Sequence, residues 1–323
     1  MKSLKIYTFI RKLNPQRFDY SCFIHLVEHL EKRGYKVERI ELDGDDGFVY
    51  KNDCEVMINQ GSISIFEYED GGFKVWDCGD HPNLTLQLHK SKNFMGAAIG
   101  QYNKKLWDDT IPTSFEKRMN IVPGIHFEQF WQYGVINYDN VQEYRKNITL
   151  DNRLLWRGSL YENCPNQNEY QGRRYISHLT KELGDKFAFG DGPLPFDEYI
   201  HEAIHFKLVL DSGVGGGYCC GDYCFKDAEM YGLGIPTIRP KYAIQPWIPL
   251  IPDYHYISID VDFDERFKYK NHEAISEKIA KRYNEVINDD DHLKYISDNA
   301  RQWYMSVLSY PVVINNIINS LSL

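Results

Sequence analysis

The sequence lacks the features that would place it in a membrane, on nucleic acid or in a disulfide-stabilised fold. No stretch approaches the roughly 18 consecutive apolar residues that a membrane span requires. A formal net charge of −9 leaves no basic excess for neutralising a phosphate backbone. Seven cysteines, an odd number in a chain of 323 residues, indicate reduced thiols. We therefore expect no membrane span, no nucleic-acid partner and no disulfide framework.

Signatures of common metal and cofactor sites are also missing. Cys219, Cys220 and Cys224 do not have the paired spacing of a structural zinc site. Acidic runs such as Asp289 to Asp291 are interpreted as solvated turns. The segment after Ile10 lacks the glycines of a dinucleotide-binding turn, which disfavours an oxidoreductase. The chain is expected to need no metal ion and no cofactor.

What the chain does have is an aromatic content of 15% and an alternation of strand and helix patterns. Lys5 to Ile10 predicts a strand, Tyr20 to Arg33 an amphipathic helix closed by Gly34, and Lys36 to Leu42 a second strand. Such a β-α-β opening is typical of parallel sheets. Further short strands are predicted at Glu55 to Asn59, Phe73 to Cys78, Leu84 to Leu88 and Met95 to Ala98.

The alternation is clearest in the second half of the chain. Strands are predicted at 154–156, 186–189, 206–211, 235–239 and 256–259, and helices at 170–183, 196–203, 225–231, 271–287 and 292–309. We expect two α/β domains, at residues 1–140 and 141–300, and a C-terminal helix at 301–323 that returns towards the first domain. Open α/β sheets bind ligands at the carboxyl ends of their strands, so candidate residues are sought there.

The first candidate segment follows the strand that ends in Trp156. Arg157, Gly158 and Ser159 come next, and arginine suits a diphosphate because its planar fork binds two oxygens and keeps its charge. The alternative for Arg157 is an ordinary strand-end arginine paired with a carboxylate. Arg173 and Arg174 lie early in a predicted helix, where a positive charge opposes the helix dipole unless an anion is near, and we expect one of them to serve the site.

The second candidate segment follows the strand that ends at Asp211. Ser212 begins a glycine-rich loop in which Gly215, Gly216 and Gly217 permit close approach of backbone N–H groups to a ligand. The loop matches neither the dinucleotide fingerprint nor the P-loop. The helix after it carries Phe225, Lys226 and Glu229. Lys226 could reach a phosphate and Glu229 could bind ribose hydroxyls. The alternative is that both are ordinary exposed helix residues.

A candidate general base lies in the first half of the chain. Asp80 follows a predicted strand in the turn Cys78 to Pro82, and a carboxylate there could take a proton from an attacking hydroxyl. His81 and Asp19 are the next candidates. A turn-capping aspartate is the alternative interpretation of Asp80.

Several of these segments resemble signatures of one family. In the second half of the chain, Leu155 to Ser159 matches a W-R-G-S motif, Arg173 or Arg174 matches a downstream arginine, and Leu250 to Ile257 matches L-x-P-x-x-H-Y-[IV]. Nearer the amino terminus, Ile121 to Phe127 with Phe130-Trp131 is similar to a proline and aromatic segment. Gly79 to Pro82 is similar to the segment with a catalytic aspartate. Together they resemble glycosyltransferase family 90, which includes capsule-associated xylosyltransferases and protein O-glucosyltransferases. The similarity covers about residues 75 to 310.

The resemblance implies a GT-B fold, in which two Rossmann-like domains face a central cleft and the C-terminal helices pack across both. It implies an inverting, metal-independent transfer of a sugar, of the xylose or glucose class, from a UDP-sugar to a hydroxyl of a glycan or glycoprotein. The UDP-sugar would be a co-substrate held mostly by the second domain. Asp80 and Arg157 would be the catalytic residues of that reaction. The residues expected to contact the donor are Trp156, Gly158, Ser159, Arg173, Arg174, Asp211, Ser212, Gly215, Gly216, Gly217, Phe225, Lys226 and Glu229.

Two alternative functions stay open. The helix that begins at Phe225 is equally similar to the donor helix of GT-B fucosyltransferases, which would make GDP-fucose the donor. A non-catalytic nucleotide-sugar or carbohydrate-binding protein would share the fold but lack a working base. Residues Met1 to Arg11 lack the apolar core of a secretory signal, so the expected location is the cytoplasm. If the protein is virus-encoded, this would be the cytoplasm of the host cell.

Overall fold

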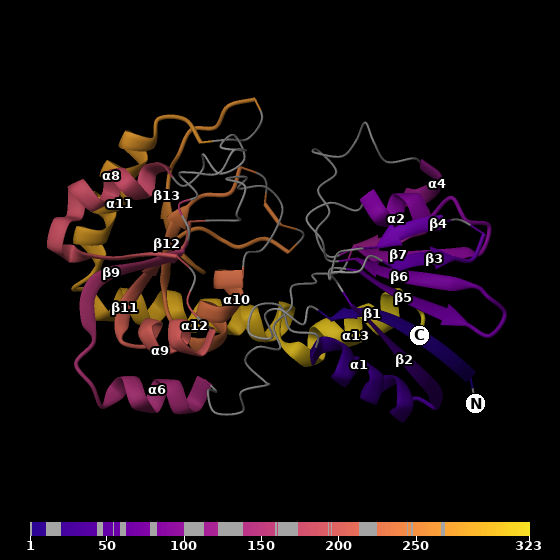
Figure 1. The fold of residues 1–323 in the computed structure, drawn as a ribbon. Helices are drawn as coiled ribbons and strands as arrows, with labels where there is room; N and C mark the ends of the chain where they lie inside the picture. The colour runs from indigo at the N-terminus through magenta and orange to yellow at the C-terminus, as the bar shows by residue number, and fades with distance from the viewer. Residues whose placement is uncertain are drawn as a thin grey trace. The chain divides into compact units, whose positions relative to one another are not determined.

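Two α/β units make up the chain in the computed structural model (Figure 1). Unit 1 comprises residues 1–132 and 308–323, and unit 2 comprises residues 133–307. The structure describes residues 2–10, 21–43, 48–53, 55–58, 63–77, 83–99, 113–121, 138–158, 160, 174–192, 194, 196–212, 225–243, 245–246, 248–265 and 269–323.

Unit 1 is built on a six-stranded sheet of order β2-β1-β5-β6-β7-β8. Its strands are β1 (Lys2–Ile10), β2 (Tyr35–Asp43), β5 (Ile63–Tyr68), β6 (Phe73–Asp77), β7 (Phe94–Ile99) and β8 (Met119–Ile121), and β3 (Phe48–Lys51) and β4 (Glu55–Ile58) form a separate antiparallel pair. Its helices are α1 (Ser21–Lys32), α2 (Asn83–Leu88), α4 (Thr113–Glu116) and α13 (Tyr310–Ser320).

The opening β1-α1-β2 of unit 1 confirms the predicted β-α-β unit. Leu26 and Leu30, one helical turn apart, are buried on the sheet side of α1. Gly34 ends the helix with a φ of +86°, a conformation that glycine adopts without strain, and β2 then pairs with β1 in parallel. The sheet is nevertheless mixed, because β5 runs antiparallel to both β1 and β6. Strands β3, β5 and β8 were not predicted.

The segment Leu84 to Leu88, predicted as a strand, is instead part of helix α2. The alternation of leucine with threonine and glutamine has a period of two, which favoured a strand. The buried positions are Thr85 and Leu88, however, which are three residues apart as on a helix. The Thr85 hydroxyl donates to the buried carboxylate of Asp77 at 2.6 Å, which satisfies both groups and ties α2 to the end of β6.

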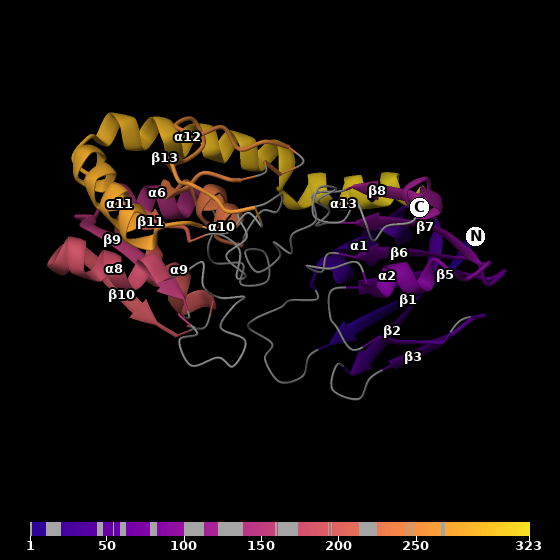
Figure 2. The ribbon, with the colours of Figure 1, turned by 90° about the horizontal axis from the view of Figure 1, so that it is seen from above.

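Helix α13 completes the core of unit 1 although it comes from the end of the chain. Its apolar face shares one cluster with residues of α1 and the sheet, namely Val313, Ile314, Ile317, Ile318, Leu321, Leu4, Ile6, Leu26, Leu30, Phe66 and Trp76. Figure 2 shows α13 beside the strands of unit 1, and it contacts β7. Arg33 Nη1 donates to the backbone oxygen of Leu323 at 3.4 Å, and Lys74 Nζ donates to that of Leu321.

Unit 2 is built on a five-stranded, fully parallel sheet of order β10-β9-β11-β12-β13. Its elements are α6 (Tyr138–Lys146), β9 (Asp151–Gly158), α8 (Arg174–Leu183), the 3₁₀ turn η2 (Gly184–Lys186), β10 (Phe187–Asp191), α9 (Phe196–Ala203), β11 (Phe206–Leu210), α10 (Phe225–Leu233), β12 (Thr237–Pro240), β13 (Ile257–Ile259), α11 (His272–Val286) and α12 (Asp290–Val307). The predicted alternation in this half is confirmed.

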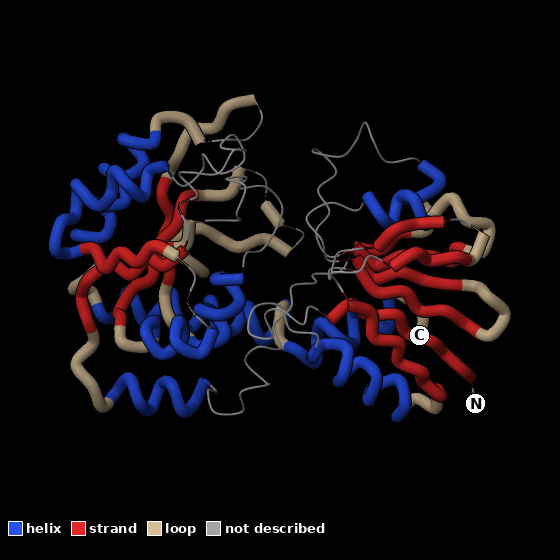
Figure 3. Tube along the Cα trace, viewed as in Figure 1, coloured by secondary structure: helices blue, strands red, loops and turns tan. Residues whose placement is uncertain are grey.

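Helices cover both faces of the sheet in unit 2, as Figures 1 and 3 show. Helices α8 and α11 contact each other and pack on one face, and α9 packs on the other. The central strands are therefore buried on both sides, which explains the unbroken apolar runs Leu154 to Trp156 and Leu208 to Leu210.

The two long helices of unit 2 have the predicted amphipathic spacing. Ile275, Ile279, Tyr283 and Val286 are all buried on one face of α11. Asn271 caps this helix by accepting the backbone N–H of Ala274 at 3.1 Å. None of the helices in the described ranges is long and apolar enough to cross a membrane.

Candidate functional site

The sheet of unit 2 has a point where its strand order reverses direction. From β9 the chain crosses to β10 on one side and then to β11 on the other side of β9. Doubly wound sheets of this order bind ligands beyond the carboxyl ends of the two strands that flank such a point, here β9 and β11. The segment containing Arg157 ends β9, and Asp211 and Ser212 directly follow β11. The two predicted segments thus lie at the carboxyl ends of neighbouring strands.

One row of residues crosses the sheet at this carboxyl end. Gly190 of β10 pairs with Arg157, and Arg239 of β12 pairs with Ser258. The registers Leu155 with Val209 and Leu210 with Ile238, continued by one or two residues, place Asp211 between Arg157 and Arg239. We call Gly190, Arg157, Asp211, Arg239 and Ser258 the carboxyl-end row. The preceding row is apolar, so charge is concentrated where the strands end.

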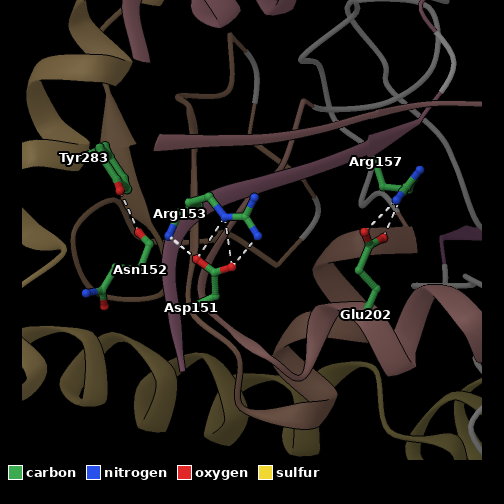
Figure 4. A network of polar contacts seen from close by, with 6 residues as sticks. All are labelled: Asp151, Asn152, Arg153, Arg157, Glu202 and Tyr283. Atoms are coloured by element: carbon green, nitrogen blue, oxygen red, sulfur yellow. Dashed lines mark hydrogen bonds and ion pairs between the residues drawn. The ribbon is translucent and has the colours of Figure 1, made fainter. Parts of the chain in front are cut away.

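Arg157 is paired with Glu202 from the last turn of α9 (Figure 4). Nε donates to Oε2 at 2.9 Å and Nη2 donates to Oε1 at 2.5 Å, with the two side chains 23% and 26% exposed. These hydrogen bonds raise the pKa of Arg157 above its ordinary value. The alternative of a strand-end arginine paired with a carboxylate therefore describes its surroundings in this structure. The pair fixes the orientation of the guanidinium at the end of β9.

A second ion pair on the same strand, also drawn in Figure 4, differs in kind. At the amino end of β9, Arg153 pairs with Asp151 only two residues away, and these side chains are 51% and 29% exposed. The Arg153 hydrogen bonds lower the pKa of the Asp151 carboxyl. Arg153 lies at the opposite end of the strand from Arg157, which makes it a useful reference for the role of Arg157.

The absence of a side chain at Gly190 leaves room for the Arg157 guanidinium. A Cβ atom at residue 190 would lie 2.0 Å from Nη1 and 2.1 Å from Cζ of Arg157, so the guanidinium occupies the space that any side chain would take. Sequence reasoning singled out neither Gly190 nor Glu202. The glycine follows the apolar run Phe187 to Phe189, and a glycine at a strand end was the signal that could have found it.

Asp211 is held by a partner that the sequence did not reveal. Its Oδ2 lies 2.8 Å from Nη1 of Arg239, and both side chains are almost completely buried. Nη1 also donates to the Tyr242 hydroxyl at 2.6 Å, and the guanidinium lies 3.8 Å from the centroid of that ring. The Asp211 side chain therefore forms a buried ion pair and does not face solvent. The signal available in the sequence was an arginine within the mostly apolar segment Ile235 to Pro240.

Trp156, predicted to contact a donor, is completely buried. Its side chain points to the other face of the sheet from Arg157, because neighbouring side chains of a strand alternate. Phe189 covers it, with ring centroids 5.5 Å apart and planes inclined by 11°. Phe189 itself is 39% exposed. Of these two stacked aromatic residues, Phe189 is therefore the accessible one.

The other predicted contacts in unit 2 are scattered around this edge. Gly158 ends β9, and Ser212 is buried directly after Asp211. Glu229 lies within α10 and is 8% exposed, so little of it reaches solvent. Arg174 is the exposed first residue of α8, and its charge contributes to a lowered pKa of His272, behind the larger effect of burial. Arg174 is thus near the start of α11.

Several predicted site residues lie outside the described part of the chain. They are Ser159, Arg173, Gly215, Gly216, Gly217, Asp80, His81 and Asp19. Phe225 and Lys226 are the first residues of α10. The buried Asp77, three residues before Asp80, marks the carboxyl end of β6 in unit 1.

The segment Leu250 to Ile257 forms a tight turn before β13. Asp253 adopts a φ of 55° and accepts hydrogen bonds from the backbone N–H and the hydroxyl of Ser258 at 3.0 and 2.8 Å. His255 is buried and accepts the Ile251 N–H at Nδ1. Burial lowers the pKa of His255 to about 4, so its imidazole is neutral at pH 7. These motif residues hold the turn together.

Acidic residues after β13 show a pattern that the sequence interpretation passed over. Asp260 and Asp262 form a D-x-D arrangement at a strand end. Asp260 is 81% exposed at its side chain and pairs with Lys241 at 2.6 Å. In the described ranges, no three His, Cys, Asp or Glu side chains gather closely enough to hold a metal ion.

Comparisons with known proteins give structural similarity only. Neither a protein-family model nor a curated protein matches the sequence. The structure is similar to HepE from Anabaena solved with UDP and glucose (10% identity, TM-score 0.45, 71% of this chain and 63% of that chain). It is also similar to sucrose-phosphate synthase from Thermosynechococcus elongatus (10%, 0.49, 96% of each chain) and to WaaG, a glycosyltransferase involved in lipopolysaccharide biosynthesis (12%, 0.46, 98% and 99%).

These values are too low to transfer a substrate or a reaction, and the chain spans less than two thirds of the length of HepE. What the topology itself establishes is the fold class. The described elements form two Rossmann-like α/β units, which is the domain content expected from the sequence.

Proposed function

We propose that this protein is a glycosyltransferase that binds a nucleotide-sugar donor at the carboxyl edge of the sheet in unit 2. One observation carries the proposal: the W-R-G-S segment and the Asp-Ser-glycine segment end two hydrogen-bonded strands at the reversal point of the sheet. The sequence separates these segments by about 50 residues, and the topology brings their starting points to one edge. Such an edge suits a diphosphate, which needs a fixed cation and backbone N–H groups.

In the proposed reaction an acceptor hydroxyl attacks the anomeric carbon of the donor sugar. The new carbon–oxygen bond forms on the face opposite the breaking bond to the diphosphate, so the configuration inverts. A base takes the hydroxyl proton, and the nucleoside diphosphate leaves with the bonding electron pair. Asp80 is the proposed base, with His81 and Asp19 as the next candidates.

Arg157 is the proposed cation for the leaving diphosphate. Negative charge grows on the diphosphate as the bond breaks, and a cation already in position stabilises it without having to reorganise. Glu202 and Gly190 hold the guanidinium in such a fixed position. The Arg157 and Glu202 side chains are 23% and 26% exposed, so the guanidinium is accessible to a ligand from solvent.

The finer identity of the reaction rests on the resemblance to glycosyltransferase family 90. On that basis we propose a UDP-sugar of the xylose or glucose class, a glycan or glycoprotein acceptor, metal independence and action in the cytoplasm. GDP-fucose belongs in the same donor screen because of the similarity of the segment that begins at Phe225. Release of each nucleotide diphosphate in the presence of EDTA tests donor and metal dependence together.

Substitution of Arg157 by Ala tests the proposal directly. Loss of one fixed charge at the leaving group should lower kcat/KM for transfer by about 100-fold or more. Arg153→Ala on the same strand is the matched control and should leave transfer unchanged, since its side chain lies at the amino end. Near-normal transfer by folded Arg157→Ala protein would remove Arg157 from the reaction and with it the main support for the proposal.

A non-catalytic binding protein is the second candidate. Arg157 and Asp211 both pair within the chain, with Glu202 and Arg239, as purely structural residues also would. Donor hydrolysis separates the two candidates. A folded protein that binds nucleotide sugars, yet releases no nucleotide diphosphate with any acceptor, would be a binding protein of the same fold.

A further inference from the structure

Phe189 is an unusual residue for its place in the fold. It is the middle residue of β10, one position before the carboxyl-end row, and it is 39% exposed. Phe187 on the same strand is 7% exposed, and the neighbouring Trp156 is completely buried. A large apolar side chain is therefore presented to solvent one residue from the edge where the sheet is expected to bind a ligand.

The ring of Phe189 is held rigidly. It stacks on the fully buried Trp156 with a centroid distance of 5.5 Å and an inclination of 11°. Phe187 contacts it from the side, with centroids 6.1 Å apart. A ring fixed in this way loses little conformational entropy when a ligand stacks on it, which favours binding.

The ring is also next to the proposed diphosphate site. Gly190 directly follows Phe189, and the Arg157 guanidinium occupies the space over Gly190. Because side chains alternate along a strand, the ring and the guanidinium lie on opposite sides of the end of β10. A ligand that lies across this end of the sheet would meet a cation with one part and an aromatic face with another.

A nucleotide has this combination of charge and aromatic face, and a lipid-linked sugar phosphate does not. We propose that Phe189 is the stacking platform for the base of the donor nucleotide, with the diphosphate at Arg157. This inference rests on the proposed function and specifies the donor class of the same site. Stacking accepts any base because every base has a π-face, so Phe189 would supply affinity, and other groups would choose the base.

The test compares a ligand that has a base with one that has none. UDP and inorganic pyrophosphate are titrated into wild-type protein, Phe189→Leu and Phe189→Tyr by calorimetry. Leucine keeps an apolar cover over Trp156 but has no π-face, and tyrosine keeps the ring. We expect Phe189→Leu to weaken UDP binding about tenfold, within the usual range for base stacking, and to leave pyrophosphate binding unchanged. Phe189→Tyr should bind UDP like the wild type.

Tyr295→Leu is the matched control, because Tyr295 is a similarly exposed aromatic residue (49%) on α12 of the same unit. It should change neither affinity. Melting temperatures of the ligand-free variants show whether Phe189→Leu has disturbed the fold around Trp156.

The outcomes separate this inference from the proposed function. Unchanged UDP affinity in Phe189→Leu, or an equal loss for UDP and pyrophosphate, would overturn the stacking role while leaving a donor site at Arg157. If wild-type protein bound neither UDP nor pyrophosphate, the proposed function would fall together with the inference.

Discussion

Two arginine–carboxylate pairs include residues of the carboxyl-end row, and they differ in exposure. Arg239 and Asp211 are almost completely buried, whereas Arg157 and Glu202 are about one quarter exposed. A buried pair contributes little net stability but is costly to break, because one charge is left without its partner. A partly exposed pair is accessible to a ligand while its partner keeps it in position. The first pair therefore holds the edge together, and the second is available for binding.

The largest effect is expected when the buried pair is broken. Arg239→Met leaves Asp211 as a buried carboxylate and should lower the free energy of unfolding by about 3–5 kcal/mol. Urea denaturation followed by circular dichroism measures the change. Asp211→Leu added to Arg239→Met removes the remaining charge and should restore part of the loss.

Arg153→Met is the control for this measurement. Its pair with Asp151 is exposed, and such pairs contribute about 1 kcal/mol or less. Equal destabilisation by Arg239→Met and Arg153→Met would contradict the contrast between buried and exposed pairs. Arg157→Ala should fall between the two in stability while having the largest effect on transfer.

The pH dependence of stability tests the buried histidine in the turn before β13. The folded-state pKa of His255 is about 4, below its ordinary value of 6.5. Between these values the unfolded chain binds a proton that the folded chain does not, so the free energy of unfolding should decrease as pH falls from 6.5 towards 4. Urea denaturation at about pH 7.5, 6.5, 5.5 and 4.5 measures this decrease in the free energy of unfolding.

His255→Gln isolates that contribution, because His272 also has a lowered pKa and stays in place in the variant. The variant should lose less stability than the wild type between pH 6.5 and 4.5, a window set by the ordinary and shifted pKa values. Parallel curves for the two proteins would show that His255 does not govern the slope.

The fold of unit 2 could be predicted more fully than that of unit 1. Runs such as Leu208 to Leu210 are apolar throughout because helices bury both faces, and this pattern leaves few alternatives to a parallel strand. In unit 1 the alternating leucines of Leu84 to Leu88 favoured a strand, although Thr85 is satisfied by Asp77 in a helix. That contact depends on a residue in another element, and a local pattern does not contain it.

The candidate site could likewise be predicted only where the signal lies in a local sequence pattern. Arg157 and Asp211 were found because they follow apolar strands. Their partners Glu202 and Arg239 lie 45 and 28 positions further along the chain, on elements whose packing the pattern alone does not specify. Phe189 was missed because its exposure depends on β10 being the edge strand of the sheet.

The smallest effect is expected from Gly190→Ala, which moves the Arg157 side chain without changing any charge. The new Cβ would overlap the guanidinium, while the strand backbone accepts alanine as well as glycine. Displacement from the fixed position should lower kcat/KM for transfer about tenfold, in the range that misplacement of a catalytic group costs. The decisive measurement is the double variant: with Arg157 already replaced by Ala, Gly190→Ala should have no further effect, because the group it displaces is gone. An equal loss in both backgrounds would mean that Gly190 acts on the edge independently of Arg157, and that the position of the guanidinium over Gly190 has no role in transfer.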